Sequence, residues 1–321
     1  MKERARAAGE GGAPDAGAAG LTLRQLAGPE DYRACYELQQ VTWGRGFEGV
    51  VPPSVLKVAQ RVGGILAGAF AADGRLLGFV LGLTGVRPPG SRRAAPAVLP
   101  AAAVAPAPPP AREAAAPRPE LLHWSHMLAV APEARDLGLG TRLKLYQREL
   151  LLPLGVEVVE WTYDPLEARN AHLNLNRLGA EVVEYVEDMY EGESGSELAR
   201  GIGTDRFIVA WRIAGERVRA ALARQARAAT ADAVARFAGA PWVEPAAVGG
   251  GEPPLPSAPR VRIEVPARIQ ALKDEQPERA LAWRLGTRRA FEAYLARGYR
   301  VTAFWRDAAG RCCYGVEAAS R

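Results

Sequence analysis

A glycine-bearing turn between a strand-like segment and a helix-like segment is the part of this sequence best suited to chemistry. Residues 126–130 have the pattern of a strand end, and a helix begins within residues 138–141, Gly-Leu-Gly-Thr. The first turn of a helix presents backbone N–H groups without partners, together with the positive end of the helix dipole. Glycines in such a turn let an anion approach the backbone. The turn therefore predicts a phosphate-binding site, with Arg135 beside it as a charge partner.

Other interpretations of this turn make different demands on the sequence. A Walker loop needs Lys-Ser or Lys-Thr after its glycines, and neither pair is present. A dinucleotide-binding loop needs a third glycine, but Thr141, Arg142 and Leu143 follow the second one. A helix cap that binds no ligand remains the alternative, and it is the commoner case for an isolated Gly-x-Gly.

The arrangement Arg135-x-x-Gly138-x-Gly140 resembles the (Gln/Arg)-x-x-Gly-x-(Gly/Ala) diphosphate loop of the GNAT acetyltransferase superfamily. The order of the surrounding elements agrees with that family over about residues 20–213. The resemblance implies acetyl-CoA or a related acyl-CoA as co-substrate, with its pantetheine arm paired to the preceding strand like an added strand. The cofactor-binding residues that it implies are Leu128, Val130, Arg135, Gly138, Leu139, Gly140, Thr141 and Asn170.

A second segment, from Asn170 to Ala180, resembles the next helix of the family, which opens with Asn and closes with Gly-Phe. Two residues depart from the family pattern. Ala180 replaces the usual aromatic residue, and Asn176 stands near the place where many members carry a Tyr that protonates the leaving thiolate. The general acid is therefore unassigned, and the alternatives for it are Tyr163, Tyr185 and Tyr190.

Two side chains near the turn are candidates for catalysis. Period-two alternation places His126 on one face of its strand with Trp124 and Leu128, and an imidazole can accept a proton near neutral pH. The alternative for His126 is a buried, hydrogen-bonded sheet residue without a catalytic part. Asp164, at the end of the neighbouring strand, could bind an amine or orient His126, or it could cap the following helix.

These residues predict an N-acyltransferase that acts on a small-molecule or peptide amine by direct attack within a ternary complex. Cys35, Cys312 and Cys313 are remote from the turn in sequence, so none is expected to carry an acyl intermediate. The same cysteines lack the spacing of a zinc site, and no metal is expected. The alternative function is a non-catalytic acyl-CoA-binding or regulatory module, in which the C-terminal unit fills the acceptor cleft.

The element order predicts an α/β fold with a mixed sheet and a small C-terminal α/β extension that packs on the main domain. Residues 161–171 also resemble an uncharacterised branch of the family that carries such an extension. The expected parts are a flexible tail at 1–19, an acyltransferase domain at 20–213 with a Pro/Ala-rich insertion at 86–120, a helix and linker at 214–260, and the extension at 261–321.

Hydrophobic patterning sets the expected boundaries of the elements. Asp73-Gly74 between two apolar runs predicts a tight hairpin. The helix that ends at Gly298 echoes the one that ends at Gly179, either as a degenerate repeat or by coincidence. Strands are expected at residues 21–25, 64–72, 76–83, 122–130, 156–163, 181–185, 206–213, 261–265, 299–305 and 311–316, and helices at 29–42, 137–152, 167–178, 216–237 and 277–297.

Composition limits the classes of partner. The chain has 321 residues, 48% of them hydrophobic, and a net charge of +5 without a dense Lys/Arg block. Nucleic acid is therefore not an expected partner, and the arginines of residues 217–227 have the spacing of an ordinary helix surface. No apolar run could span a bilayer, and the first residues lack the apolar core of a signal peptide. A cytoplasmic protein without membrane contact is expected, and a homodimer stays open.

Overall fold

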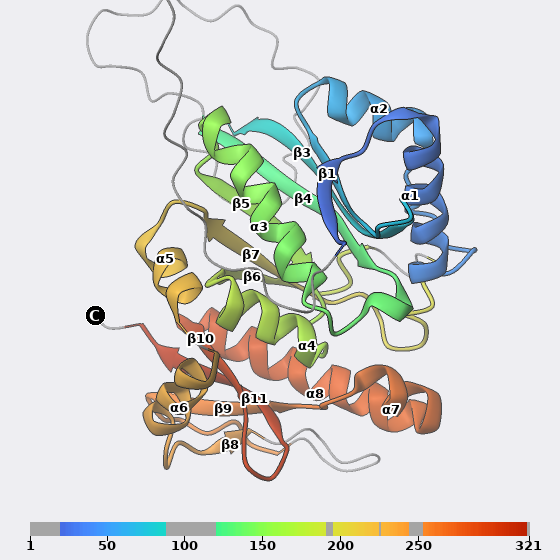
Figure 1. Cartoon of the computed structure of the whole chain (residues 1–321). Coiled ribbons are helices and arrows are strands. Elements are labelled where there is room, and N and C mark those ends of the chain that lie inside the picture. The colour runs from blue at the N-terminus through green and yellow to red at the C-terminus, as the bar shows by residue number, and fades with distance from the viewer. Residues whose placement is uncertain (1–19, 88–119, 191–194, 225, 244–252, 320–321) are drawn as a thin grey trace, which may run out of the picture.

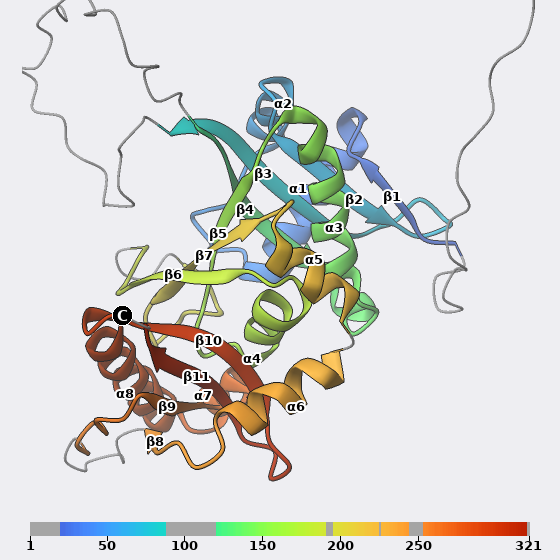
Figure 2. The same cartoon turned by 90° about the vertical axis from the view of Figure 1, so that its left-hand side faces the viewer.

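The computed structural model describes residues 20–87, 120–190, 195–224, 226–243 and 253–319. These residues form two β-sheets with helices around them (Figures 1 and 2). The expected tail at 1–19, and all but the ends of the expected insertion at 86–120, lie outside the described residues. Within the part of the chain that is described, no helix is both long and apolar enough to cross a membrane.

The larger sheet is mixed, as the sequence predicts. Its strands are β1 (Thr22–Gln25), β2 (Ile65–Phe70), β3 (Leu76–Arg87), β4 (Glu120–Val130), β5 (Val158–Tyr163), β6 (Glu181–Val186) and β7 (Arg206–Arg212). They lie in the order β1-β2-β3-β4-β5-β7-β6, and β4 and β5 are parallel while the other neighbours are antiparallel. The hairpin predicted at Asp73-Gly74 is present, with Gly74 at φ 85° in the left-handed region that favours glycine.

Helices cover both faces of this sheet. They are α1 (Gly28–Trp43), α2 (Pro53–Arg61), α3 (Leu139–Leu151) and α4 (Ala168–Ala171), with the π-helix η3 (His172–Arg177) continuing α4 and the short 3₁₀ turns η1 (Pro132–Ala134) and η2 (Leu152–Leu154) flanking α3. On β3, the Phe79 ring contacts Trp43 of α1, whereas Leu143 of α3 lies where a side chain at Gly78 would point. Because neighbouring strand residues point to opposite faces, α1 and α3 cover opposite faces of the sheet.

The smaller sheet belongs to the C-terminal part of the chain. Its strands are β8 (Trp242–Val243), β9 (Arg260–Val265), β10 (Tyr299–Arg306) and β11 (Cys312–Ala318), in the order β10-β11-β9-β8. Its helices are α5 (Glu216–Ala223), α6 (Ala226–Arg236), α7 (Ile269–Glu275) and α8 (Pro277–Ala296). The single helix expected at 216–237 is wrong, because Arg224 is extended (φ −82°, ψ 143°) and separates α5 from α6.

The smaller sheet repeats the topology of one half of the larger sheet. In the larger sheet, β5, a helix, β6 and β7 give the spatial order β5-β7-β6; in the smaller one, β9, helices, β10 and β11 give β9-β11-β10. Each set has a parallel strand beside its first member, β4 in one case and β8 in the other. Gly179 and Gly298, both at positive φ, end the equivalent helices. The shared topology favours a degenerate repeat over coincidence.

The two sheets share one apolar core, which joins the C-terminal unit to the main domain. The Phe207 ring of β7 lies 4.7 Å from Phe291 of α8 and 5.6 Å from Tyr314 of β11, and Tyr185 of β6 packs against Phe291. Such aromatic pairs contribute roughly 0.5–1.5 kcal/mol each beyond the area that they bury. The prediction that the extension packs on the main domain is confirmed.

Candidate functional site

The sheet opens between β4 and β5. These strands pair only from Leu122 to Trp124 on β4 and from Val158 to Glu160 on β5, although β4 continues to Val130. Beyond the last pair, the backbone of β4 that faces β5 is free of ladder hydrogen bonds. A free strand edge can pair with an extended ligand as it would with another strand. The carboxyl ends of β4 and β5 are therefore unpaired with each other, and the stretch between them is called the slot below.

A β-bulge lies at the point where the slot begins. The register of β3 against β4 shifts between Leu81 and Gly82, which leaves His126 without an opposite residue. The extra residue reverses the alternation of side chains, so that Trp124 and Leu128 lie on opposite faces of the sheet. The prediction that Trp124, His126 and Leu128 share one face is therefore wrong, because period two does not allow for an inserted residue.

The first turn of α3 closes the far end of the slot and keeps its amides unpaired. Gly138 is the N-cap residue, in the left-handed conformation (φ 69°, ψ 12°), and no side chain caps the helix. The first backbone hydrogen bond of the helix runs from Arg142 N–H to the Gly138 carbonyl, at 3.1 Å. The N–H groups of Leu139, Gly140 and Thr141 thus have no acceptor among the described residues. Unpaired N–H groups at a helix start are able to bind an anion.

The start of α4 lies beside this turn. Arg169 contacts Asp136 across the opening at 3.3 Å, and Asn170 next to it is exposed. On the inner side, Leu128 of β4 and Leu173 of the π-helix both approach within 4 Å of the place that a Gly140 side chain would occupy. The structure therefore brings together the cofactor-binding segments that the sequence indicates: the end of β4, the turn and the start of α4.

A parallel pair of strands diverges in front of an uncapped helix N-terminus, within a mixed sheet covered on both faces. This is the arrangement that the resemblance to the GNAT acyltransferases predicts. Neither a family profile nor a curated protein sequence matches the chain.

Solved structures similar to this chain include acetyltransferases. The ribosomal-protein-S18-alanine N-acetyltransferase of Escherichia coli is 18% identical with a TM-score of 0.39 over 61% of this chain and 97% of its own. A GNAT-family acetyltransferase of Streptococcus pneumoniae is 15% identical (TM-score 0.39; 59% and 97%). NAA60 of Arabidopsis thaliana, solved with acetyl-CoA, is 13% identical (TM-score 0.43; 60% and 99%). These similarities concern the fold alone.

Asp164, which follows β5, is engaged by contacts within the protein. One carboxylate oxygen accepts a hydrogen bond from the backbone N–H of Leu166 at 2.8 Å, and the other binds the buried Arg284 guanidinium of α8 at 2.5 Å. Arg206 lies 3.8 Å from the same oxygen. The structure shows no contact with His126. The helix cap considered from the sequence is also wrong, because the N-cap of α4 is Glu167 and no side chain caps that helix. Asp164 instead stabilises the turn after β5 and forms an ion pair with the C-terminal unit.

His126 is exposed, in contrast to the buried alternative considered from the sequence. Desolvation by the surrounding protein lowers its pKa from the usual value, so that the imidazole is neutral at physiological pH. A neutral imidazole is able to accept a proton.

The three candidate tyrosines differ in exposure. Burial raises the pKa of Tyr163 far above its usual range, and Tyr185 donates a short hydrogen bond to Asp205, which with burial also raises its pKa. Tyr190 is exposed, and its hydroxyl lies 3.0 Å from that of Thr162 at the end of β5. Of the three, Tyr190 is thus the one whose hydroxyl a substrate can reach.

Asn176, which stands where many family members carry a Tyr, is turned toward the C-terminal unit. Its amide nitrogen donates to the Phe304 carbonyl of β10 at 2.9 Å and lies 3.1 Å from Nδ1 of His172. The sequence could not show that this position anchors a second sheet.

No group of three metal-ligating side chains gathers among the described residues.

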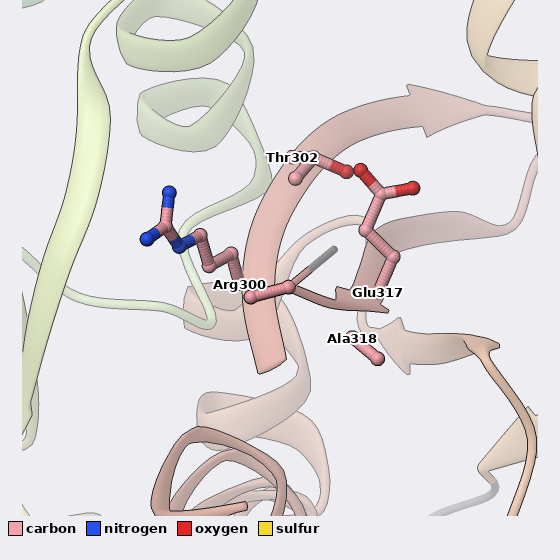
Figure 3. A pocket seen from close by; sticks show the side chains of 5 residues that line it. Arg300, Thr302, Glu317 and Ala318 are labelled. Carbon is pink, nitrogen blue, oxygen red and sulfur yellow. The ribbon is translucent and has the colours of Figure 1, made fainter. Parts of the chain in front are cut away.

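A second hollow lies outside the slot, between β10 and β11. It has a volume of about 290 Å³ and is lined by Arg300, Thr302, Glu317, Ala318 and Ala319. Figure 3 shows the Arg300 side chain extending away from Glu317. Glu317 is itself paired with Arg236 and Arg260. Arg300 and Glu317 therefore do not converge on one point in this hollow.

Proposed function

We propose that the protein is an acyl-CoA-dependent N-acyltransferase, with acetyl-CoA as donor and a small-molecule or peptide amine as acceptor. The observation that carries this proposal is the row of unpaired N–H groups at Leu139, Gly140 and Thr141, which faces the opening between β4 and β5. The diphosphate of coenzyme A would accept hydrogen bonds from these groups. Arg135 and Asn170 are exposed beside the turn and would contact the same part of the cofactor.

The pantetheine arm would lie along the free edge of β4, with Leu128 and Val130 supplying backbone groups, and would bring the thioester toward the bulge. The acceptor must attack as a neutral amine: a C–N bond forms, the C–S bond breaks, and coenzyme A leaves as a thiolate. His126 is our candidate for accepting the amine proton, and Tyr190 for donating a proton to the thiolate.

The cysteines support direct attack rather than an acyl-enzyme intermediate. Cys35, Cys312 and Cys313 are all buried. Burial raises the pKa of Cys35 to about 12 and raises those of the other two as well, so the reactive thiolate form is suppressed.

Substitution of Gly138 tests the diphosphate site. In Gly138→Val a β-branched side chain would stand in the path of the diphosphate, and we expect the affinity for coenzyme A measured by calorimetry to fall about 100-fold or more. Gly155→Val is the matched control, since Gly155 also has a positive φ (75°) and open space around it, but lies beyond the other end of α3. Both variants should lose similar stability. Unchanged affinity in folded Gly138→Val would argue against the proposal.

A second candidate function, an acyl-CoA-binding module without catalysis, has its own supporting observations. Asp164 and Asn176, both near the slot, are engaged by Arg284 and by the Phe304 carbonyl of the C-terminal unit. Turnover of acetyl-CoA across a panel of amines, in wild type and His126→Ala, separates the two. Intact binding of coenzyme A without turnover of any amine would favour the module. An amine-dependent release of coenzyme A that is lost in His126→Ala would favour the enzyme.

A further inference from the structure

A lysine lies at the apex of the slot. Lys144 of α3 is 3% exposed, and its Nζ lies 2.7 Å from Oγ of Ser125 and 3.7 Å from the centre of the Trp161 ring. Ser125 directly follows Trp124, the last residue of β4 that pairs with β5, and Trp161 directly follows Glu160 on β5. The amine therefore lies on the α3 side of the sheet, against a residue from each of the two strands and next to the point where they part.

A chain of hydrogen bonds fixes the orientation of this amine. It runs from Lys144 through Ser125, Gln147, His123 and Thr84 to the carbonyl oxygen of Gly63. The carbonyl can only accept, so the Thr84 hydroxyl donates to it and accepts from Nδ1–H of His123. Nε2 of His123 must then accept from the Gln147 amide.

The same assignment of donors and acceptors extends to Lys144. The Gln147 carbonyl oxygen accepts from the Ser125 hydroxyl at 3.0 Å, and the Ser125 oxygen must in turn accept from Nζ–H of Lys144. The lone pair of a neutral Lys144 amine is therefore not used by Ser125. It remains available to a group that enters the slot.

The choice of lysine at this position fits a neutral amine. Lysine occurs at only four positions in a chain that has 41 lysines and arginines together, namely Lys2, Lys57, Lys144 and Lys273. A buried arginine would keep its charge, whereas a buried lysine can lose its proton. Desolvation lowers the pKa of Lys144 well below its usual value, and no ion pair to a carboxylate is recorded for it within the described residues.

We propose that Lys144 is a self-acylation site, at which the acyl group of a thioester bound in the slot is transferred to Nζ. The inference rests on the proposed function, since the same bound acyl-CoA is the donor. The Nζ lone pair attacks the thioester carbonyl carbon, a C–N bond forms, and the C–S bond breaks with its electron pair on sulfur. The proton lost by nitrogen passes to that thiolate, so the products are an N-acyl-lysine and the free thiol of coenzyme A.

Mass spectrometry of the full-length protein tests this inference without knowledge of the acceptor. The protein is incubated with isotope-labelled acetyl-CoA, and modified lysines are mapped and quantified by peptide sequencing. We expect one labelled acetyl group per chain, on Lys144, at a rate about tenfold or more above that of exposed Lys57. Acetyl phosphate, which cannot use the slot, should show the opposite preference, because Lys57 is accessible and Lys144 is not.

Two variants serve as controls. Gly138→Val should lose the label on Lys144 while Lys57 reacts as before, and Lys144→Met should lose the label while still binding coenzyme A in calorimetry. Binding of coenzyme A without any label on Lys144 would overturn the inference and leave the proposed function intact. Absence of binding in wild type would overturn both. Equal labelling of Lys144 in wild type and Gly138→Val would also overturn it, since the reaction would then not depend on the slot.

Discussion

At the scale of single residues, the polar chain beneath the sheet depends on a neutral histidine. His123 is fully buried, and burial lowers its pKa to about 3 from the usual 6.5. A side chain at Gly82 would come within 2.0 Å of its Nε2 atom, which explains the glycine at that position. A protonated His123 could not accept from Gln147, so the chain that orients Lys144 requires the neutral form.

The titration of His123 should therefore make the free energy of unfolding depend on pH. Between about pH 3 and 6.5 the unfolded chain binds a proton at this residue and the folded chain does not. The free energy of unfolding should thus fall as the pH drops below 6.5, by up to about 1.4 kcal/mol per pH unit from this group. Urea unfolding of wild type and His123→Asn at several pH values measures the difference. An identical pH dependence in both proteins would contradict the assignment.

At the scale of elements, the helix α8 is joined to the main sheet by ionic contacts that sequence patterning does not reveal. The Arg284 guanidinium is fully buried, donates to the Ile202 carbonyl at 2.9 Å, and binds Asp164. Arg288, one turn further on, binds Asp205 at the start of β7. An apolar stripe on α8 predicts that one face of the helix is buried. It does not indicate which sheet covers that face.

Removal of the buried arginine should be costly. Arg284→Met leaves Asp164 and a carbonyl group without their partner, and we expect the free energy of unfolding to fall by about 3 kcal/mol or more. Arg200→Met is the control, because Arg200 forms an exposed ion pair with Glu197 and should contribute less than about 1 kcal/mol. Chemical denaturation measures both. Similar small losses in the two variants would show that the ion pair with Asp164 does not hold α8 in place.

Elements with strong local signals could be predicted from the sequence, and those that depend on distant contacts could not. The turn before α3, the Asp73-Gly74 hairpin and the strands of both sheets other than β8 follow from local patterns. The helices α2 and α7 are short, and β8 has only two residues. None of the three is long enough for a hydrophobic period to show in the sequence. The bulge at His126 arises from pairing with β3, and the contacts of Asp164 and Asn176 come from residues more than 100 positions away.

At the scale of the whole molecule, the C-terminal unit repeats the half of the fold against which it packs. Its strand β10 lies beside β6, as Figure 2 shows. Its helix α8 contacts β6, and Phe291 of α8 packs against Phe207 of β7. The aromatic core around Phe207 is shared, so the two sheets cannot separate without exposing it. The turn before α3 and the opening between β4 and β5 belong to the main domain. The C-terminal unit contacts this domain through Asp164 and Asn176.

A structure of the protein with coenzyme A tests the central claim most directly. The account predicts diphosphate oxygens within hydrogen-bonding distance of the backbone N–H groups of Leu139, Gly140 and Thr141, with the pantetheine arm between β4 and β5. Coenzyme A bound elsewhere, or strands that close on each other with the turn unoccupied, would contradict it.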